Sequence, residues 1–213
     1  MHKILSKLKD HVLIPIIRTK TFLEAEALAN LLVESGLKVI EITMSVPDSY
    51  KLINQLKAKY SDIIVGAGTV LEKEQVVYSM GAGAQFIVSP VIDPKIIKIT
   101  KKYKVLTIPG AMTPTEILSA VNAGINAVKI FPASAFGGAF YLKAVKQIFP
   151  DIAFMPTGGI DSDNLKSYLE AGADLIGMGG NLADVKLLKE KKFDEIQDYA
   201  KRVMEIIRDF KKK

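Results

Sequence analysis

The sequence contains no cysteine and only two histidines, His2 and His11. Without cysteine the chain can form neither a disulfide framework nor a thiolate metal site, which fits a reducing compartment. No apolar run approaches the roughly 20 residues that a membrane-spanning helix needs. The N-terminus follows an amphipathic helical pattern and lacks the apolar segment and cleavage site of a signal peptide. We therefore expect a cytoplasmic protein with no membrane partner.

Basic residues outnumber acidic ones and give a formal net charge of +6, part of it from Lys211–Lys213. The sequence lacks the interleaved aromatic and basic residues, and any recognition motif, that would indicate a nucleic-acid interface. The lysines are spread over many predicted helix faces. This distribution is typical of a solvated surface, and it is compatible with small anionic substrates.

Strand-like apolar runs alternate with segments of helical periodicity along most of the 213 residues, after a short N-terminal helix. The predicted strands are Val12–Ile17, Val39–Thr43, Ile63–Gly68, Phe86–Ser89, Val105–Ile108, Ala127–Phe131, Ala153–Met155 and Leu175–Met178. The helices that follow them are Thr21–Ser35, Asp48–Tyr60, Lys73–Met80, Pro94–Lys102, Pro114–Ala123, Phe140–Phe149, Asn164–Ala171 and Phe193–Phe210.

This α/β alternation predicts a parallel sheet, for which an open doubly wound arrangement is one solution. Two features favour closure into a (β/α)8 TIM barrel. The strands number eight, and a glycine that ends a helix precedes each even-numbered strand, at Gly36, Gly81, Gly124 and Gly172. No boundary interrupts the pattern, so we expect one barrel domain over residues 1–213 with a short N-terminal helix.

Two charged residues lie inside apolar strands, Lys129 in Ala127–Phe131 and Glu41 in Val39–Thr43. Burial lowers the pKa of a lysine and leaves part of it as the free amine that forms a Schiff base with a carbonyl substrate. A carboxylate in the same barrel is the acid/base that such chemistry needs. The alternatives are a structural ion pair and a lysine whose ammonium group reaches water.

Paired glycines follow the last two strands, Gly158-Gly159 after the seventh and Gly179-Gly180 after the eighth. Consecutive glycines expose N–H groups that can surround an anion, and barrels frequently bind phosphate at these two loops. Glycines can also serve only to ease tight turns. The paired glycines therefore predict a phosphate site at the loops that follow the seventh and eighth strands. The glycines of Val65–Val70, by contrast, lack the spacing of a dinucleotide fingerprint.

Six segments of the sequence are informative together: Glu41–Thr43, Val65–Val70, Gly83–Pro90, Ile108–Gly110, Lys129–Pro132 and Pro156–Ile160. They resemble the family of 2-keto-3-deoxy-6-phosphogluconate (KDPG) aldolase, which includes 4-hydroxy-2-oxoglutarate (KHG) aldolase. The resemblance runs in unbroken order from about Ile14 to Asn181. It implies a class I aldolase barrel, usually a homotrimer, that cleaves KDPG to pyruvate and glyceraldehyde 3-phosphate without a cofactor or metal.

The resemblance also implies a role for individual residues. Lys129 matches the Schiff-base lysine and Glu41 the general acid/base. Positions that line the family's substrate pocket match Arg18, Thr69, Pro90, Phe131 and Thr157, and those of its phosphate loops match Gly158, Gly159, Gly179 and Gly180. Ser45 stands where some members have an anion-binding arginine, and Asn181 stands where a serine is common, although its amide can donate to phosphate. Both departures leave the choice between KDPG, KHG or both substrates open.

Two other classes of function are compatible with the same residues. A phosphosugar isomerase or epimerase would use Glu41 as a base and Lys129 only as an electrostatic partner, and it would form no covalent adduct with pyruvate. A non-catalytic phosphosugar-binding barrel would show saturable binding without turnover. This alternative stays open because fold alone does not decide function.

Overall fold

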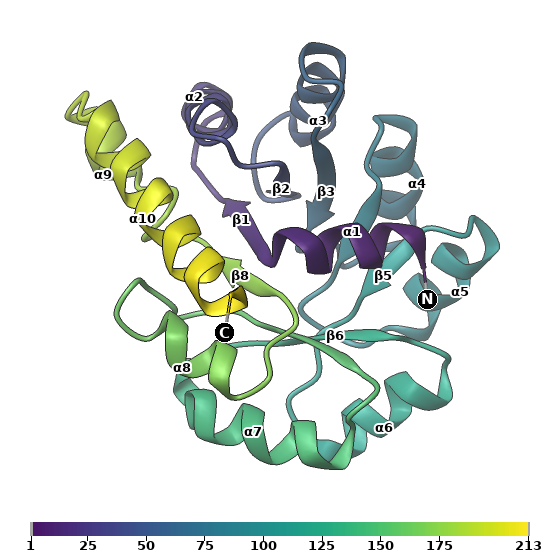
Figure 1. Cartoon of the computed structure of the whole chain (residues 1–213). Coiled ribbons are helices and arrows are strands. Elements are labelled where there is room, and N and C mark those ends of the chain that lie inside the picture. The colour runs from purple at the N-terminus through teal and green to yellow at the C-terminus, as the bar shows by residue number, and fades with distance from the viewer. Residues whose placement is uncertain (1, 213) are drawn as a thin grey trace.

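Strands and helices alternate along the chain in the computed structural model, which describes residues 2–212 (Figure 1). The strands are β1 (Leu13–Ile17), β2 (Val39–Thr43), β3 (Ile64–Gly68), β4 (Phe86–Val88), β5 (Leu106–Ile108), β6 (Ala127–Ile130), β7 (Ala153–Pro156) and β8 (Ile176–Met178). The helices are α1 (Lys3–His11), α2 (Phe22–Glu34), α3 (Ser49–Lys59), α4 (Lys73–Gly81), α5 (Pro94–Lys102), α6 (Pro114–Asn122), α7 (Gly138–Ile148), α8 (Leu165–Glu170), α9 (Val185–Lys189) and α10 (Phe193–Lys211), with a 3₁₀ turn η1 (Ser134–Phe136). None of the helices in this range is both long and apolar enough to span a bilayer.

The strands form a curled parallel sheet of six, in the order β5-β4-β3-β2-β1-β8, and a parallel pair, β6-β7. Single bridges connect the pair to both ends of the larger sheet, Gly110 with Lys129 and Thr157 with Gly177. At the first bridge the Lys129 N–H donates to the Pro109 carbonyl at 2.8 Å. The ladder hydrogen bonds thus run continuously through six strands and are reduced to isolated bridges beside β6 and β7.

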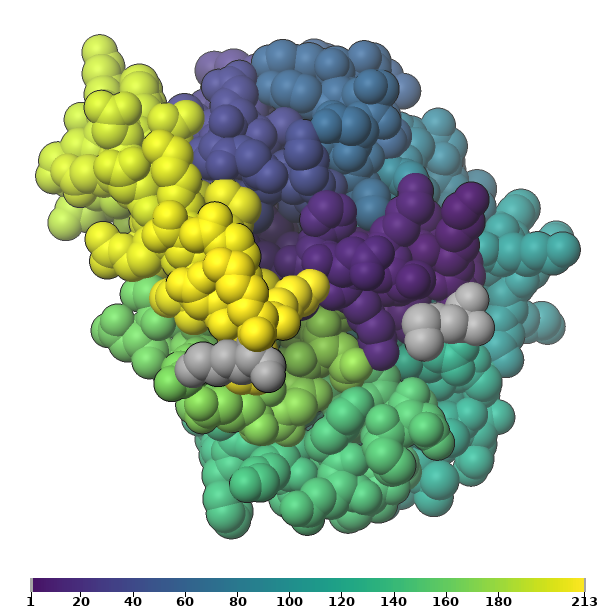
Figure 2. All heavy atoms as spheres, viewed as in Figure 1, coloured from purple at the N-terminus to yellow at the C-terminus, as the bar shows by residue number. Residues whose placement is uncertain are grey.

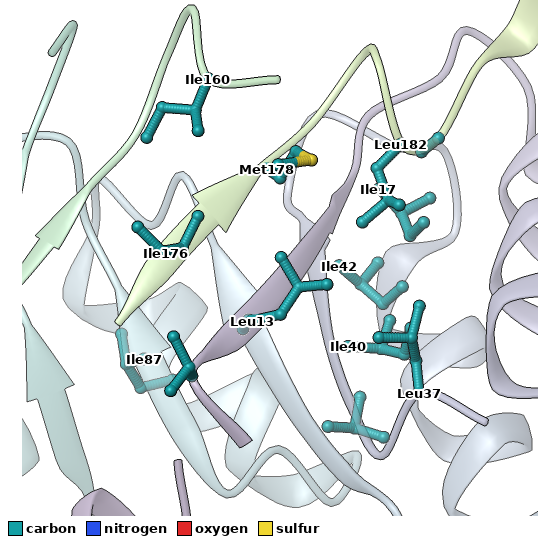
Figure 3. Close-up of a cluster of buried hydrophobic side chains, with 14 of the residues drawn as sticks. Leu13, Ile17, Leu37, Ile40, Ile42, Ile87, Ile160, Ile176, Met178 and Leu182 are labelled. Atoms are coloured by element: carbon teal, nitrogen blue, oxygen red, sulfur yellow. The ribbon is translucent and has the colours of Figure 1, made fainter. Parts of the chain in front are cut away.

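Apolar side chains fill two layers, one inside the curl of the strands and one between strands and helices. Helix α1 contributes Leu5 and Leu8, both fully buried, to the inner layer, where they pack with strand residues such as Phe86. Figure 3 shows part of the outer layer, with Leu13 of β1 and Ile40 of β2 among the side chains. Because both faces of each strand are covered, the strands read as continuous apolar runs, as parallel strands usually do.

The observed elements follow the predicted ones closely, with β2 and α5 at the predicted bounds. Two short elements, η1 and α9, were absent from the prediction. Helix α9 has five residues and begins where the Asp184 carboxylate accepts hydrogen bonds from the N–H groups of Lys186 and Leu187. One turn is too short to show helical periodicity in a sequence, so only the capping aspartate could have indicated it.

Candidate active site

Lys129 lies on β6 with only 3% of its surface exposed. Backbone hydrogen bonds to Pro109 and from Ala111 fix its position beside β5, and its register partner on β7 is Met155. Its Nζ lies 5.2 Å from the centre of the Phe131 ring. Burial lowers the pKa of Lys129, and the opposing charge of Glu41 only partly offsets this effect. The side chain is therefore a source of free amine below the pH at which an ordinary lysine deprotonates.

Glu41 lies on β2 and is completely buried. Neither carboxylate oxygen has a hydrogen-bond partner within residues 2–212. Burial raises the pKa of this carboxyl group, against the lowering effects of Lys129 and Arg18. Gly68 makes room for it, since a Cβ on Gly68 would overlap the carboxylate. A buried carboxyl group with a raised pKa and free lone pairs is suited to accept and return a proton.

Lys129 and Glu41 influence each other's pKa across the space between β2 and β6. Among the described residues they do not form an ion pair at 4.0 Å or less. In a closer ion pair, the carboxylate would stabilise the ammonium form of the lysine, and the free amine would not be available. The observed arrangement keeps an amine and a proton carrier near each other without committing either to a salt bridge.

A cavity of about 310 Å³ opens beside Lys129. Its walls include nine of the twelve predicted site residues, among them the glycines of both loops. The cavity therefore unites the lysine with the whole predicted phosphate site. The full lining consists of Ile16, Arg18, Lys129, Phe131, Thr157, Gly158, Gly159, Ile160, Gly177, Gly179, Gly180 and Asn181.

Three predicted residues lie outside this lining. Glu41 is completely buried. Thr69 is connected to the lining through Arg18, whose Nη2 donates a hydrogen bond to the Thr69 Oγ1 at 2.9 Å. Pro90 lines a neighbouring cavity of about 400 Å³, which shares the Phe131 wall. Ser45 is exposed at the end of β2, with its Oγ 2.9 Å from that of Thr43.

The two glycine loops present unused backbone donors to the cavity. Among the described residues, no hydrogen bond takes up the N–H groups of 158–160 or 179–181. Gly159 has a φ of +73°, and a Cβ there would also overlap the Ser134 hydroxyl. The Asn181 amide reaches the Ile160 carbonyl at 3.4 Å and so links the two loops. Six free N–H groups around one cavity make a suitable cradle for an anion.

The sequence reasoning missed three residues of this lining, Ile16, Ile160 and Gly177. Alternation along β1 could have placed Ile16 on the inner face. Alternation along β8 likewise puts Gly177 on the same face as Gly179. Ile160 carried no signal apart from its place after the glycines. Within residues 2–212 there is no group of three or more His, Cys, Asp or Glu side chains arranged to hold a metal ion.

The family model described as "KDPG and KHG aldolase" matches residues 4–199. The chain belongs to this aldolase family. The 2-dehydro-3-deoxy-phosphogluconate aldolase of Haemophilus influenzae is 36% identical over 207 residues, which cover 97% of each chain. The KHG/KDPG aldolase of Escherichia coli K12 is 32% identical over 192 residues, 90% of each chain.

Solved structures of the family share the fold. A KDPG aldolase from Legionella pneumophila is 31% identical and gives a TM-score of 0.86, with 93% of this chain and 97% of that chain covered. In that structure pyruvate is captured at low pH as a covalent carbinolamine intermediate.

Proposed function

We propose that the chain is a class I aldolase that cleaves KDPG to pyruvate and glyceraldehyde 3-phosphate. The observation that carries this proposal is the buried Lys129, with its lowered pKa, in a cavity that the phosphate-loop glycines also line. The relatives named as aldolases of this substrate, and the pyruvate carbinolamine in the Legionella enzyme, support the same chemistry.

The reaction begins when the free amine of Lys129 attacks the C2 carbonyl of the substrate. The carbinolamine loses water and becomes an iminium ion, which draws electrons from the neighbouring carbons. The Phe131 ring, 5.2 Å from Nζ, faces the cation with its π-electrons and favours the charged intermediate. The lowered pKa of Lys129 supplies the unprotonated amine that the first step consumes.

Glu41 moves the proton in the second half of the reaction. As carboxylate it takes the proton of the C4 hydroxyl, the C3–C4 bond breaks, and its electron pair forms the enamine while the aldehyde leaves. The protonated Glu41 then returns the proton to C3, and water hydrolyses the iminium ion to pyruvate and free Lys129. Burial raises the pKa of Glu41, which favours the protonated form that this return step uses.

The two ends of the substrate are held by groups of different kinds. The free N–H groups of 158–160 and 179–181 bind the phosphate, and the Asn181 amide adds a donor. Arg18 and Thr157 line the same cavity, and we assign them to the pyruvate moiety and its carboxylate. Pro90 contributes through the neighbouring cavity that shares Phe131, and Thr69 through the hydrogen bond that it accepts from Arg18.

KHG is the second candidate substrate, which would yield pyruvate and glyoxylate. Ser45 stands where some family members have an anion-binding arginine, and the Escherichia coli relative is named for both substrates. Comparing kcat/KM for KDPG and KHG decides between them. A preference for KDPG supports use of the phosphate loops, whereas equal values would show that the loops contribute nothing to the transition state.

Borohydride trapping tests the proposed chemistry. Incubation with pyruvate and borohydride should give one reduced adduct, which peptide mass spectrometry should map to Lys129. The adduct should be absent in Lys129→Met and present in the control Lys143→Met, which replaces an exposed lysine of α7. Folded wild-type protein without an adduct would refute the Schiff-base mechanism and favour the isomerase or binding-protein alternatives.

We also propose that the eight strands close into a (β/α)8 barrel and that residues 1–213 form one domain. The bridges at Gly110–Lys129 and Thr157–Gly177 support closure, because they join the strand pair to both ends of the six-stranded sheet. Slow hydrogen exchange at the Lys129 amide would agree with a closed barrel, and exchange at loop rates would contradict it. One cooperative unfolding transition is the corresponding expectation for a single domain.

A homotrimer and a cytoplasmic location complete the proposal. The family resemblance supports the trimer, and Phe136 and Phe140, 57% and 85% exposed, give an apolar surface for the contact. Light scattering should give three times the chain mass. A monomer at working concentration would remove the trimer, and Phe140→Ser should weaken it. The cytoplasmic location rests on the sequence composition alone.

A further inference from the structure

A second cavity, of about 580 Å³, lies at the other end of the strands from Lys129. Its walls are the end of α1, the first residue of β1, the residues just before β2 and one face of α10. Figure 2 shows the hollow between α10, in yellow, and α1, in purple. The volume falls in the range of about 300–1,000 Å³ that is usual for small-molecule sites. The aldolase chemistry proposed above makes no use of it.

The floor of this cavity is apolar and its rim is basic. Leu13, Leu37 and Ile207 are at least 95% buried and form the floor. The rim carries five lysine and arginine side chains but only two carboxylates, Asp10 and Glu205. An apolar floor under a positive rim fits a ligand that has both a hydrocarbon part and a negative charge.

Two of the rim cations are free to serve such a ligand. Lys201 and Arg208 contact only exposed carboxylates of their own helix, at 3.3 Å and 3.8 Å. Exposed pairs of this kind contribute about 0–1 kcal/mol, so an incoming anion can replace them. The backbone N–H of Lys38 donates no hydrogen bond to any residue within 2–212 and is a further donor at the rim.

The net charge around the cavity is positive. Lys211 is held in place by donating to the Asp10 carbonyl at 2.7 Å. Burial lowers the pKa of His11, against the effect of Asp10, and the charges of Lys211 and Lys38 add to the lowering. Cations therefore outweigh the nearby carboxylates at this end of the molecule.

We propose that this cavity binds an amphiphilic monoanion, a carboxylate on a short unbranched hydrocarbon chain. The chain covers Leu13, Leu37 and Ile207, while the carboxylate lies between Lys201 and Arg208. Because the cavity is at the opposite end of the strands from Lys129, the ligand and pyruvate bind at the same time.

Isothermal titration of the full chain with octanoate tests the proposal. Octanoate should bind saturably, whereas acetate lacks the chain, octanol lacks the charge, and octyltrimethylammonium has the wrong charge, so all three should bind at least tenfold more weakly. Lys201→Glu combined with Arg208→Glu should weaken octanoate binding at least tenfold. The matched control, Lys143→Glu with Lys166→Glu, makes the same charge change on exposed residues of α7 and α8 and should leave it unchanged.

A second measurement needs no variant. Octanoate should shift the methyl NMR signals of Leu37 and Ile207 and leave those of Ile16, in the Lys129 cavity, unmoved. Protein locked by pyruvate and borohydride should bind octanoate with unchanged affinity. Octanol binding as tightly as octanoate, full affinity in the Lys201→Glu, Arg208→Glu variant, or loss of binding after pyruvate locking would each overturn the assignment.

Discussion

The region around β3 and β4 and the region around β7 and β8 are held by the same arrangement of hydrogen bonds. In the first region, the Lys57 ammonium donates to the Ile63 carbonyl and to the Gln85 side chain, both at 3.0 Å. The Gln85 oxygen also accepts the Val65 N–H at 3.4 Å. A helix, a strand and the start of the next strand are thus joined through one lysine.

The second region repeats these contacts at the same sequence separations of 6, 28 and 20 residues. Lys146 donates to the Ile152 carbonyl and to the Asp174 carboxylate, both at 2.9 Å. Asp174 also accepts the Phe154 N–H at 3.1 Å. We name the two arrangements the Lys57 frame and the Lys146 frame. Their match shows that the two halves of the chain share one scaffold.

The two proposed catalytic groups occupy equivalent positions of this scaffold. The residues that follow the two N–H donors are Gly66 and Met155. Glu41 is the register partner of Gly66, and Lys129 is the register partner of Met155. The proton carrier of one half therefore corresponds to the amine of the other, and they differ only in side chain and surroundings.

The halves differ in where they place small residues. In the first half, Gly68 on β3 makes room for the Glu41 carboxylate. In the second half the glycine is on β8, where Gly177 leaves room for the Thr157 side chain that follows β7. The cavity beside Lys129 accordingly opens toward β8 and its glycine loop. The scaffold is shared, and in the proposed function the distribution of small residues decides which half binds the ligand.

Replacing Glu41 tests whether equivalent positions carry different roles, and it should have the largest effect. Glu41→Gln removes the proton carrier and should lower kcat by about 10²–10⁴-fold. The variant should still give a borohydride-trapped pyruvate adduct, because the amine of Lys129 is intact. Steady-state kinetics and peptide mass measure the two outcomes. A folded Glu41→Gln protein with full kcat, or with no adduct, would contradict the assigned roles.

The two frames should differ in their response to loss of charge. Asp174 also pairs with Lys9 of α1 at 2.7 Å, so Asp174→Asn weakens contacts to two lysines. We expect the free energy of unfolding to fall by about 1–3 kcal/mol at pH 7. Gln85→Glu replaces an amide by a carboxylate in the Lys57 frame, and it should change the free energy of unfolding by less than about 1 kcal/mol. Urea unfolding measures the free energy of unfolding of both variants. Equal losses of stability would show that the charge of the acceptor does not matter in either frame.

The effect of Asp174→Asn should depend on pH. Burial raises the pKa of Asp174, but hydrogen bonds from Lys9 and Lys146 outweigh it and leave the pKa below the ordinary 3.8. A depressed carboxyl pKa stabilises the folded state above the unfolded-state value and stops doing so as pH falls through the folded-state value. The difference between wild type and Asp174→Asn should therefore shrink in acid. A difference that stays constant from pH 7 to acid would contradict this assignment.

Much of the fold could be predicted because parallel strands buried on both faces give unbroken apolar runs. Lys129 and Glu41 were conspicuous for the same reason, since each interrupts such a run. Other features depend on neighbours that are distant in sequence. The hydrogen bond from Arg18 to Thr69, and the position of Pro90 in the adjoining cavity, follow from strand order and side-chain orientation, which local patterns do not carry.

The resemblance to a known family supplied what periodicity could not. It assigned Thr69 and Pro90 to a substrate pocket, which their local sequence alone could not do, and it favoured aldolase chemistry over a structural ion pair. The equivalence of the two frames was only partly visible, as a glycine before each even-numbered strand. The Lys57 and Lys146 contacts went unnoticed because a surface lysine has no sequence pattern that reveals its partner.

Two glycine substitutions compare positions within the phosphate loops. Gly159→Ala forces an alanine into a φ of +73° and against the Ser134 hydroxyl. Strain of about 1–3 kcal/mol should displace the loop and raise the KM for KDPG about tenfold, with less effect on KHG. Gly180→Ala is the control, because a Cβ there meets no atom within 4 Å. Equal KM values for the two variants would show that loop geometry does not hold the phosphate.

The smallest expected effect separates the lysine of the site from a lysine of the frame. In the proposed mechanism Lys129 is buried for its chemistry and not for stability. Lys129→Met should therefore raise the free energy of unfolding by about 1 kcal/mol, since an apolar side chain replaces a buried charge. Lys146→Met removes hydrogen bonds to Ile152 and Asp174 and should lower it. Urea unfolding at pH 7 compares the two variants. Destabilisation by both would indicate that Lys129 is structural as well.

The pH dependence gives this last comparison its sign. The pKa of folded Lys129 lies below the ordinary 10.5, because burial penalises the ammonium form. Above pH 10.5 neither state is charged and the penalty is absent; it grows as pH falls and is complete below the folded-state pKa. The gain from Lys129→Met should therefore be largest at the lower pH values and vanish as pH approaches 10.5. A gain in stability that increases with pH would mean that the folded protein stabilises the ammonium form of Lys129. The free amine that Schiff-base formation requires would then be lost.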